Sequence, residues 1–105
     1  MGLLTPQTGD FDAQRRQFRW TIPPEFNIAH AVCHHNGAAD DAIALFYESR
    51  TGEEARYSFG QIREYANRLA NALQAMGVER GDRVAIVLAQ RPETAIAHVA
   101  IYSIG

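Results

Sequence analysis

The feature that most constrains the fold is a helix pattern inside Tyr57–Leu88 that carries its own start and stop signals. Ser58 and Gln61 match a capping box, in which each side chain bonds the backbone N–H of the other residue. Gly77 can adopt the left-handed conformation that ends a helix. We therefore predict a helix from Ser58 to Gly77. Apolar residues at steps of three and four should form its buried face: Phe59, Ile62, Ala66, Leu69, Leu73 and Met76.

A tight turn at Glu79–Asp82 and a short apolar run follow this helix. Val84–Leu88 is apolar at every position, a pattern typical of a buried strand in a parallel α/β sheet. We expect the helix that ends at Gly77 to dock against the sheet that holds this strand. Pro92 suits the first position of a last helix, which is apolar nearly all round and should pack between other elements. Because such a strand–helix unit normally leads to a further parallel strand, we expect the chain to be the front part of a larger protein.

Residues 1–26 are predicted to form an extended arm. A short helix is expected at Asp12–Phe18, with Asp10 or Asp12 as its cap. The run Ile22–Pro24 must be extended, since each proline disfavours the helical conformation of the residue before it. Three bulky side chains should bring the arm onto a surface, part of which is expected to be absent from this chain: Phe18, Trp20 and Phe26.

Residues 27–105 are predicted to form a partial α/β domain, in which a β-hairpin and a buried strand pack with three or more helices. Asn27–Asn36 matches a helix capped by Asn27, whose shared face would hold Ile28, Ala31, Val32 and His35. Two apolar runs then flank the turn Arg50–Glu53, which is the pattern of a hairpin: Ala42–Glu48 and Ala55–Ser58.

Length and composition exclude several classes of protein. A chain of 105 residues is one domain at most. The net charge of -2 provides no basic footprint for nucleic acid. The chain contains no lysine, which excludes a lysine nucleophile and a phosphate-loop lysine within it. The single Cys33 indicates a reducing compartment, and we expect the cytoplasm. The apolar run at 95–104 is shorter than the roughly 20 residues that span a membrane.

The densest cluster of metal-type ligands lies in the predicted helix at residues 27–36. A structural zinc needs four ligands, and no second group of histidines or cysteines completes the set. We therefore interpret the cluster as surface or half-buried histidines around a packed cysteine, with no bound metal. Its members are His30, Cys33, His34 and His35.

The remaining candidates also have structural interpretations. The acidic pairs Asp40-Asp41 and Glu53-Glu54 lie in predicted turns, where solvation is expected. His98 is interpreted as a packed, hydrogen-bonded histidine of the last helix rather than a catalytic base. Gly77 and Gly81 lack the spacing of a phosphate loop. We accordingly predict no catalytic, cofactor-binding or metal-binding residue in this chain.

Four motifs follow one another along the chain: Tyr57-Ser58-Phe59-Gly60-Gln61-Ile62, Ala66-Asn67-Arg68-Leu69-Ala70-Asn71-Ala72-Leu73, Gly77-Val78-Glu79-Arg80-Gly81-Asp82-Arg83-Val84-Ala85-Ile86 and Gln90-Arg91-Pro92-Glu93. Together they resemble one protein family, the AMP-forming acyl-CoA synthetases of the adenylate-forming superfamily. The resemblance is to their N-terminal subdomain and covers residues 26–105 in family order. Ile22–Asn27 is more similar to the acetyl-, medium-chain and aryl-CoA synthetase branch.

The resemblance implies a ligase that joins a carboxylic acid to coenzyme A by way of an acyl-adenylate. The implied cofactors are ATP, Mg and coenzyme A, and the implied partner is the remainder of the parent chain. The family's catalytic segments lie downstream in relatives and match nothing here, so the 105-residue chain is expected to be inactive and able to form a homodimer. Two alternatives remain: a peptide-synthetase-type adenylation or luciferase-like enzyme, and a non-catalytic interaction module of the same fold.

Overall fold

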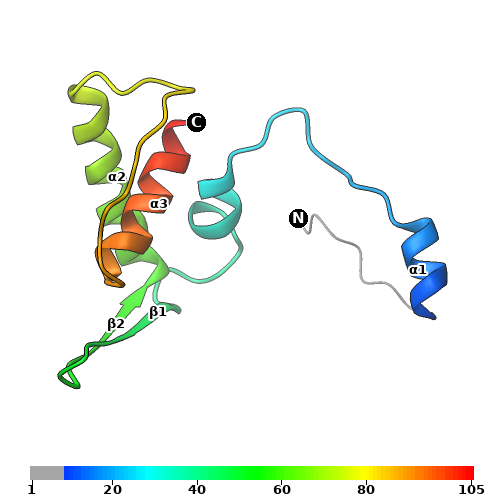
Figure 1. The fold of residues 1–105 in the computed structure, drawn as a ribbon, viewed down its shortest axis with the longest axis horizontal. Coiled ribbons are helices and arrows are strands. Elements are labelled where there is room, and N and C mark those ends of the chain that lie inside the picture. Colours follow the sequence, from blue (N-terminus) through cyan, green and yellow to red (C-terminus); the bar gives the residue numbers. More distant parts are fainter. Residues whose placement is uncertain (1–8) are drawn as a thin grey trace.

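The computed structural model describes residues 9–105, so the first eight residues of the predicted arm lie outside the described residues. Its elements, in chain order, are a short helix, one π-helical turn, a β-hairpin and two longer helices. Figure 1 shows the two longer helices side by side, with the hairpin at one end of them and the first helix set apart. The α/β fold class predicted from the sequence is confirmed.

Helix α2 spans Phe59–Ala75, and local signals set both of its ends. The Gln61 N–H donates to Ser58 Oγ at 3.2 Å, and the Ser58 N–H donates to Gln61 Oε1 at 2.9 Å. At the other end Gly77 has a φ of +96°, and the Val78 N–H donates to the Leu73 carbonyl oxygen at 3.0 Å. The predicted capping box and glycine stop are therefore both confirmed.

Helix α3 spans Pro92–Ile104 and packs along α2. Pro92 occupies the first turn, as predicted. Where the two helices meet, the buried side chains are small, namely Ala66, Ala70 and Ala100, and larger apolar side chains surround them only partly buried. We predicted that α2 would dock on a sheet holding the Ile86 strand. That prediction is wrong, because the main partner of α2 is α3.

Strands β1 (Ile43–Glu48) and β2 (Glu54–Ser58) form the predicted antiparallel hairpin. The turn between them is closed by the Ser49 N–H, which donates to the Glu53 carbonyl oxygen at 2.8 Å. In the part of the chain that the structure describes, these two strands are the whole sheet. The hairpin leads directly into α2 at Ser58, so it fixes where that helix begins.

The predicted buried strand at Val84–Leu88 is not present in the described residues. The segment is irregular, and it runs beside α3 with Val84 and Ile86 half-buried and Val87 93% exposed. A β-strand exists only where a second strand completes its hydrogen-bond ladder, and no described strand pairs with this one. The alternating burial shows that one side of the segment covers α3, while the other side faces solvent.

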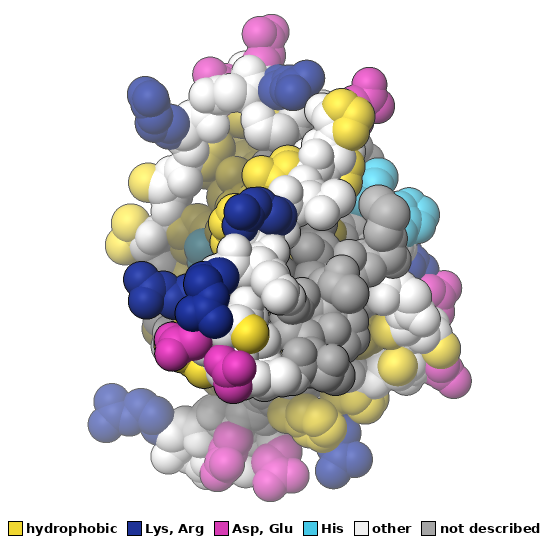
Figure 2. Space-filling view, turned by 90° about the vertical axis from the view of Figure 1, so that its right-hand side faces the viewer, with side chains coloured by type: hydrophobic (Ala, Val, Ile, Leu, Met, Phe, Trp, Pro, Cys, Tyr) yellow, Lys and Arg dark blue, Asp and Glu magenta, His cyan; other side chains and the backbone are white. Residues whose placement is uncertain are grey.

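Helix α1 (Phe11–Gln17) belongs to the arm and confirms the predicted short helix and its cap. The Ala13 N–H donates to Asp10 Oδ1 at 2.9 Å. The helix buries no residue, and Figure 1 shows it away from α2 and α3. Figure 2 views the side that carries α1, where hydrophobic side chains lie exposed among basic and acidic ones. Contact of the arm with a surface therefore stays a prediction.

The described residues bury a small core. Its buried members are five alanines, Cys33, Ile62 and Pro92, and no large side chain is fully enclosed. The radius of gyration is 17.0 Å, against about 13 Å for a compact domain of this length. The described helices include none that is both long and apolar enough to cross a membrane.

Candidate functional site

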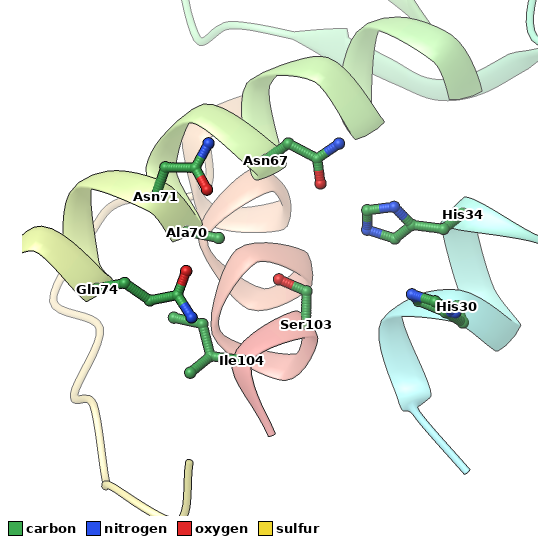
Figure 3. A pocket seen from close by; sticks show the side chains of 8 residues that line it. All are labelled: His30, His34, Asn67, Ala70, Asn71, Gln74, Ser103 and Ile104. Atoms are coloured by element: carbon green, nitrogen blue, oxygen red, sulfur yellow. The ribbon is translucent and has the colours of Figure 1, made fainter. Parts of the chain in front are cut away.

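The cleft that we consider as the candidate site lies between the π-helical turn η1 (His30–His34), the middle of α2 and the end of α3. It is open to solvent and has a volume of about 480 Å³. Figure 3 shows the imidazoles of His30 and His34 on one side and the carboxamides of α2 on the other. The lining residues are His30, His34, Asn67, Ala70, Asn71, Gln74, Ser103 and Ile104.

The turn η1 is shorter and wider than the predicted helix at residues 27–36. The His35 N–H donates to the His30 carbonyl oxygen at 2.8 Å, five residues back, which defines a π-helical turn. Asn27 still acts as the predicted cap, because its Oδ1 accepts from the His30 N–H at 3.2 Å.

The buried face of this segment differs from the predicted one. Ala29 and Cys33 are buried, whereas Ile28 and Val32 are about half exposed. Together with the wider turn, this packing places Ala29 and Cys33 against the rest of the molecule in place of the predicted set. The prediction that Cys33 is a small packed side chain is confirmed.

The electrostatics of η1 reflect burial. Burial raises the pKa of the Cys33 thiol, with a smaller opposing effect of Arg63, so the thiol is a poor nucleophile. Burial also lowers the pKa of His34, and the neighbouring His30, His35 and Arg63 lower it further. His34 is half-buried, and its Nε2 atom has no hydrogen-bond partner among the described residues.

Histidines 30, 34 and 35 do lie together, as their sequence positions suggest. The ring of His30 is 5.3 Å from that of His34 and 4.8 Å from that of His35, between centroids. Within residues 9–105, however, no three His, Cys, Asp or Glu side chains are placed to hold a metal ion together. The arrangement therefore offers hydrogen bonding rather than metal coordination.

The other sequence candidates lie apart from the cleft. Asp40 pairs with Arg63 at 2.7 Å, and Asp41, Glu53 and Glu54 are exposed. His98 is hydrogen-bonded as predicted, with Nδ1 3.3 Å from the Tyr102 hydroxyl, but it is exposed rather than packed.

Asn67, Asn71 and Gln74 form a polar stripe on α2 that was not predicted from the sequence. Their spacing of four and three residues is the signal that places them on one helix face. With the imidazoles and the Ser103 hydroxyl they give the cleft a neutral, hydrogen-bonding lining. Mg²⁺ prefers carboxylate and phosphate oxygens, and a nucleotide triphosphate needs cationic or backbone N–H partners. The lining holds no carboxylate, lysine or arginine side chain, so these residues do not fit Mg-ATP.

Comparison with known proteins identifies relatives for nearly the whole chain. Residues 33–105, more than half of the chain, match the profile of the family described as AMP-binding enzyme. The chain is similar to acetyl-coenzyme A synthetase of Streptomyces coelicolor, with 36% identity over 83% of this chain and 14% of the relative. It is also similar to acetyl-coenzyme A synthetase of Caulobacter vibrioides, with 36% identity over 97% of this chain and 17% of the relative.

A further relative is the acyl-coenzyme A synthetase ACSM3, mitochondrial, of Homo sapiens, with 32% identity over 96% of this chain and 19% of the relative. The chain thus spans less than a fifth of the length of these curated relatives.

Proposed function

The chain belongs to the AMP-binding enzyme family and corresponds to an N-terminal portion of an AMP-forming acyl-CoA synthetase, and from this premise we propose its role in the complete protein. The complete protein activates a carboxylic acid: a carboxylate oxygen attacks the α-phosphorus of ATP, and pyrophosphate leaves. The thiol of coenzyme A then attacks the acyl carbon, and AMP leaves with the bridging oxygen. The observation that supports this proposal is the family match over residues 33–105.

Within that enzyme, we propose that residues 9–105 act as a scaffold and carry no catalytic group. The absence of lysine and the neutral lining of the cleft support this role, because phosphate binding and acyl transfer need charged groups. ATP, Mg and coenzyme A are then held by other parts of the complete protein, and the 105-residue chain alone is inactive.

The exposed surface of the chain supports a scaffold that other polypeptide covers. Its accessible surface is 8407 Å², against about 5,900 Å² for a compact monomer of this mass. Large apolar side chains are exposed both on the arm and along Val84–Leu88. We propose that the remainder of the parent chain covers these faces. We also propose that the complete protein works in the cytoplasm.

The acceptor of the acyl group is proposed to be coenzyme A rather than the thiol of a carrier protein. The names of the relatives from Streptomyces coelicolor and Homo sapiens, which specify coenzyme A, favour this acceptor. A peptide-synthetase-type or luciferase-like enzyme would share only the adenylation step.

The test begins with the nucleotides that follow codon 105 in the native gene. These nucleotides give the sequence of the complete protein, which would then be purified. The complete protein should exchange pyrophosphate into ATP when supplied with acetate, a medium-chain acid or an aromatic acid. Addition of coenzyme A should then release AMP. Exchange without coenzyme A-dependent AMP release would contradict the proposed acceptor, and no exchange with any of these acids would contradict the ligase. Turnover by the 105-residue chain alone would overturn the scaffold role.

A further inference from the structure

The wide turn of η1 gathers three imidazoles on one side of the chain. Because the hydrogen bond runs from the His35 N–H to the His30 carbonyl oxygen, residues four and five positions after His30 lie near its side chain. The resulting centroid distances are 5.3 Å to His34 and 4.8 Å to His35. An ordinary α-helical turn would separate residues 30 and 35 more widely around the helix. The cluster therefore depends on η1 keeping this conformation.

The turn η1 is also held against α2 by its buried residues. Ala29 and Cys33 are buried, at 0% and 3% exposure, and Cys33 Sγ lies 3.9 Å from the Phe59 carbonyl oxygen. His34 follows Cys33 directly, and Figure 3 shows its ring directed towards α2. Its Nε2 atom is enclosed and has no hydrogen-bond partner among the described residues. A proton added at this atom would place a positive charge in the contact between η1 and α2, and the new N–H would have no hydrogen-bond acceptor there.

The groups that face His34 do not compensate such a charge. From its own element come His30 and His35, and the coulombic influence of both lowers the pKa of His34. From α2 come Arg63, which is cationic, and the uncharged Asn67. The carboxylate of Asp40 is already paired with Arg63 at 2.7 Å. From α3 the cleft receives the Ser103 hydroxyl, which donates to the Ala100 carbonyl oxygen.

We propose that η1 is a pH-sensitive contact, which holds the arm to α2 and α3 when His34 is neutral and releases it when His34 is protonated. Docking lowers the pKa of His34, chiefly through burial, so the undocked turn binds the proton more tightly. The stabilisation of the docked state is therefore complete above the ordinary histidine pKa of about 6.5. It is lost as the pH falls below that value. This inference does not depend on the proposed ligase activity.

Cys33 provides a built-in reporter, because it is the sole cysteine of the chain and is buried in this contact. The 105-residue chain would be treated with 4,4′-dithiodipyridine at a series of pH values from neutral to mildly acidic. Each rate would be divided by the rate of the urea-unfolded chain at the same pH, which removes the intrinsic pH dependence of the thiol. We expect the normalised rate to rise several-fold below the ordinary histidine pKa while the circular dichroism of α2 and α3 is unchanged.

Two variants separate the cluster from general acid effects. His34→Gln keeps a hydrogen-bonding side chain that cannot be protonated, and its normalised rate should stay low at acidic pH. His98→Gln removes a histidine that lies on α3 beside Tyr102, and it should behave as the unmodified chain does. A flat wild-type rate, or a rise that persists in His34→Gln, would overturn the proposal.

A direct titration keeps the proposal testable if His34→Gln fails to fold. In the unmodified chain, the NMR signals of the His34 ring should titrate below the ordinary histidine pKa of about 6.5. Their midpoint should coincide with the exposure of Cys33. If His34 titrates at or above the ordinary histidine pKa, or Cys33 becomes exposed at a clearly different pH, the proposal is wrong.

Discussion

The Asn27 side chain donates from Nδ2 to the Ser103 carbonyl oxygen at 3.2 Å, although the two residues are 76 positions apart. The Oδ1 atom of the same side chain accepts from the His30 N–H at 3.2 Å. One carboxamide therefore starts the η1 turn and also holds it to the end of α3. No local pattern predicts the second bond, because its acceptor lies on the last helix.

Replacing Asn27 tests this double role. Asn27→Ala removes a helix cap and a partly buried long-range hydrogen bond, so the free energy of unfolding should fall by about 1–2 kcal/mol. Urea unfolding followed by circular dichroism would measure it. Asn71→Ala is the matched control, because Asn71 is exposed on α2 and alanine favours a helix. An equal loss in both variants would show that the contact of Asn27 with Ser103 contributes nothing specific.

The assignment of the packed face of α2 can be tested at Leu69 and Met76, which both follow the apolar helical period of the sequence. Leu69 packs against the cluster of Ala66, Ala70 and Ala100, whereas Met76 is 73% exposed. Leu69→Ala should lower the free energy of unfolding by about 2 kcal/mol, near the low end for leucine because the side chain is only partly buried. Met76→Ala should change it by less than about 0.5 kcal/mol. Equal effects would mean that α2 does not pack on α3 as described.

The stop of α2 depends on the backbone of Gly77. Its φ of +96° is strained for residues that have a Cβ atom. Gly77→Ala should therefore destabilise the chain by about 1–2 kcal/mol, and Gly77→Asn by less, since asparagine tolerates this region better. Thermal unfolding of the unmodified chain and of the two variants would give the order of their stabilities. If alanine were as stable as glycine, the helix would have to end elsewhere.

The exposed apolar residues predict self-association of the 105-residue chain. Val87 is 93% exposed and Trp20 is 70% exposed, and surfaces of this kind promote association. Sedimentation velocity at increasing concentration should show dimers or larger species. Val87→Asp should weaken the association if the 84–88 segment takes part, whereas Glu48→Asp on the exposed side of the hairpin should not. A clean monomer at high concentration would contradict this prediction.

Much of the fold follows from short-range signals. The Asp10 cap, the capping box of Ser58 and Gln61, Gly77 and Pro92 all act within one helical turn, and the structure confirms each of them. The hairpin is equally local, because its two strands are joined by a tight turn.

The sequence predictions that the structure contradicts concern contacts between distant parts of the chain. Val84–Leu88 has the composition of a strand but no described partner, and Met76 follows the helical period but lies beyond the packed face. The family assignment rests on the match over residues 33–105, which does not require the predicted strand at Val84–Leu88.

The sequence by itself determined where the helices begin and end and to which family the chain is related, because capping groups and motif order are properties of neighbouring residues. Only the tertiary structure decided that α2 packs on α3, that Cys33 faces inward from a π-helical turn, and that His34 borders a polar cleft. The physical reason is that a helix satisfies its hydrogen bonds within its own segment. A strand, a buried face or a cleft depends on groups supplied by residues far away in the chain.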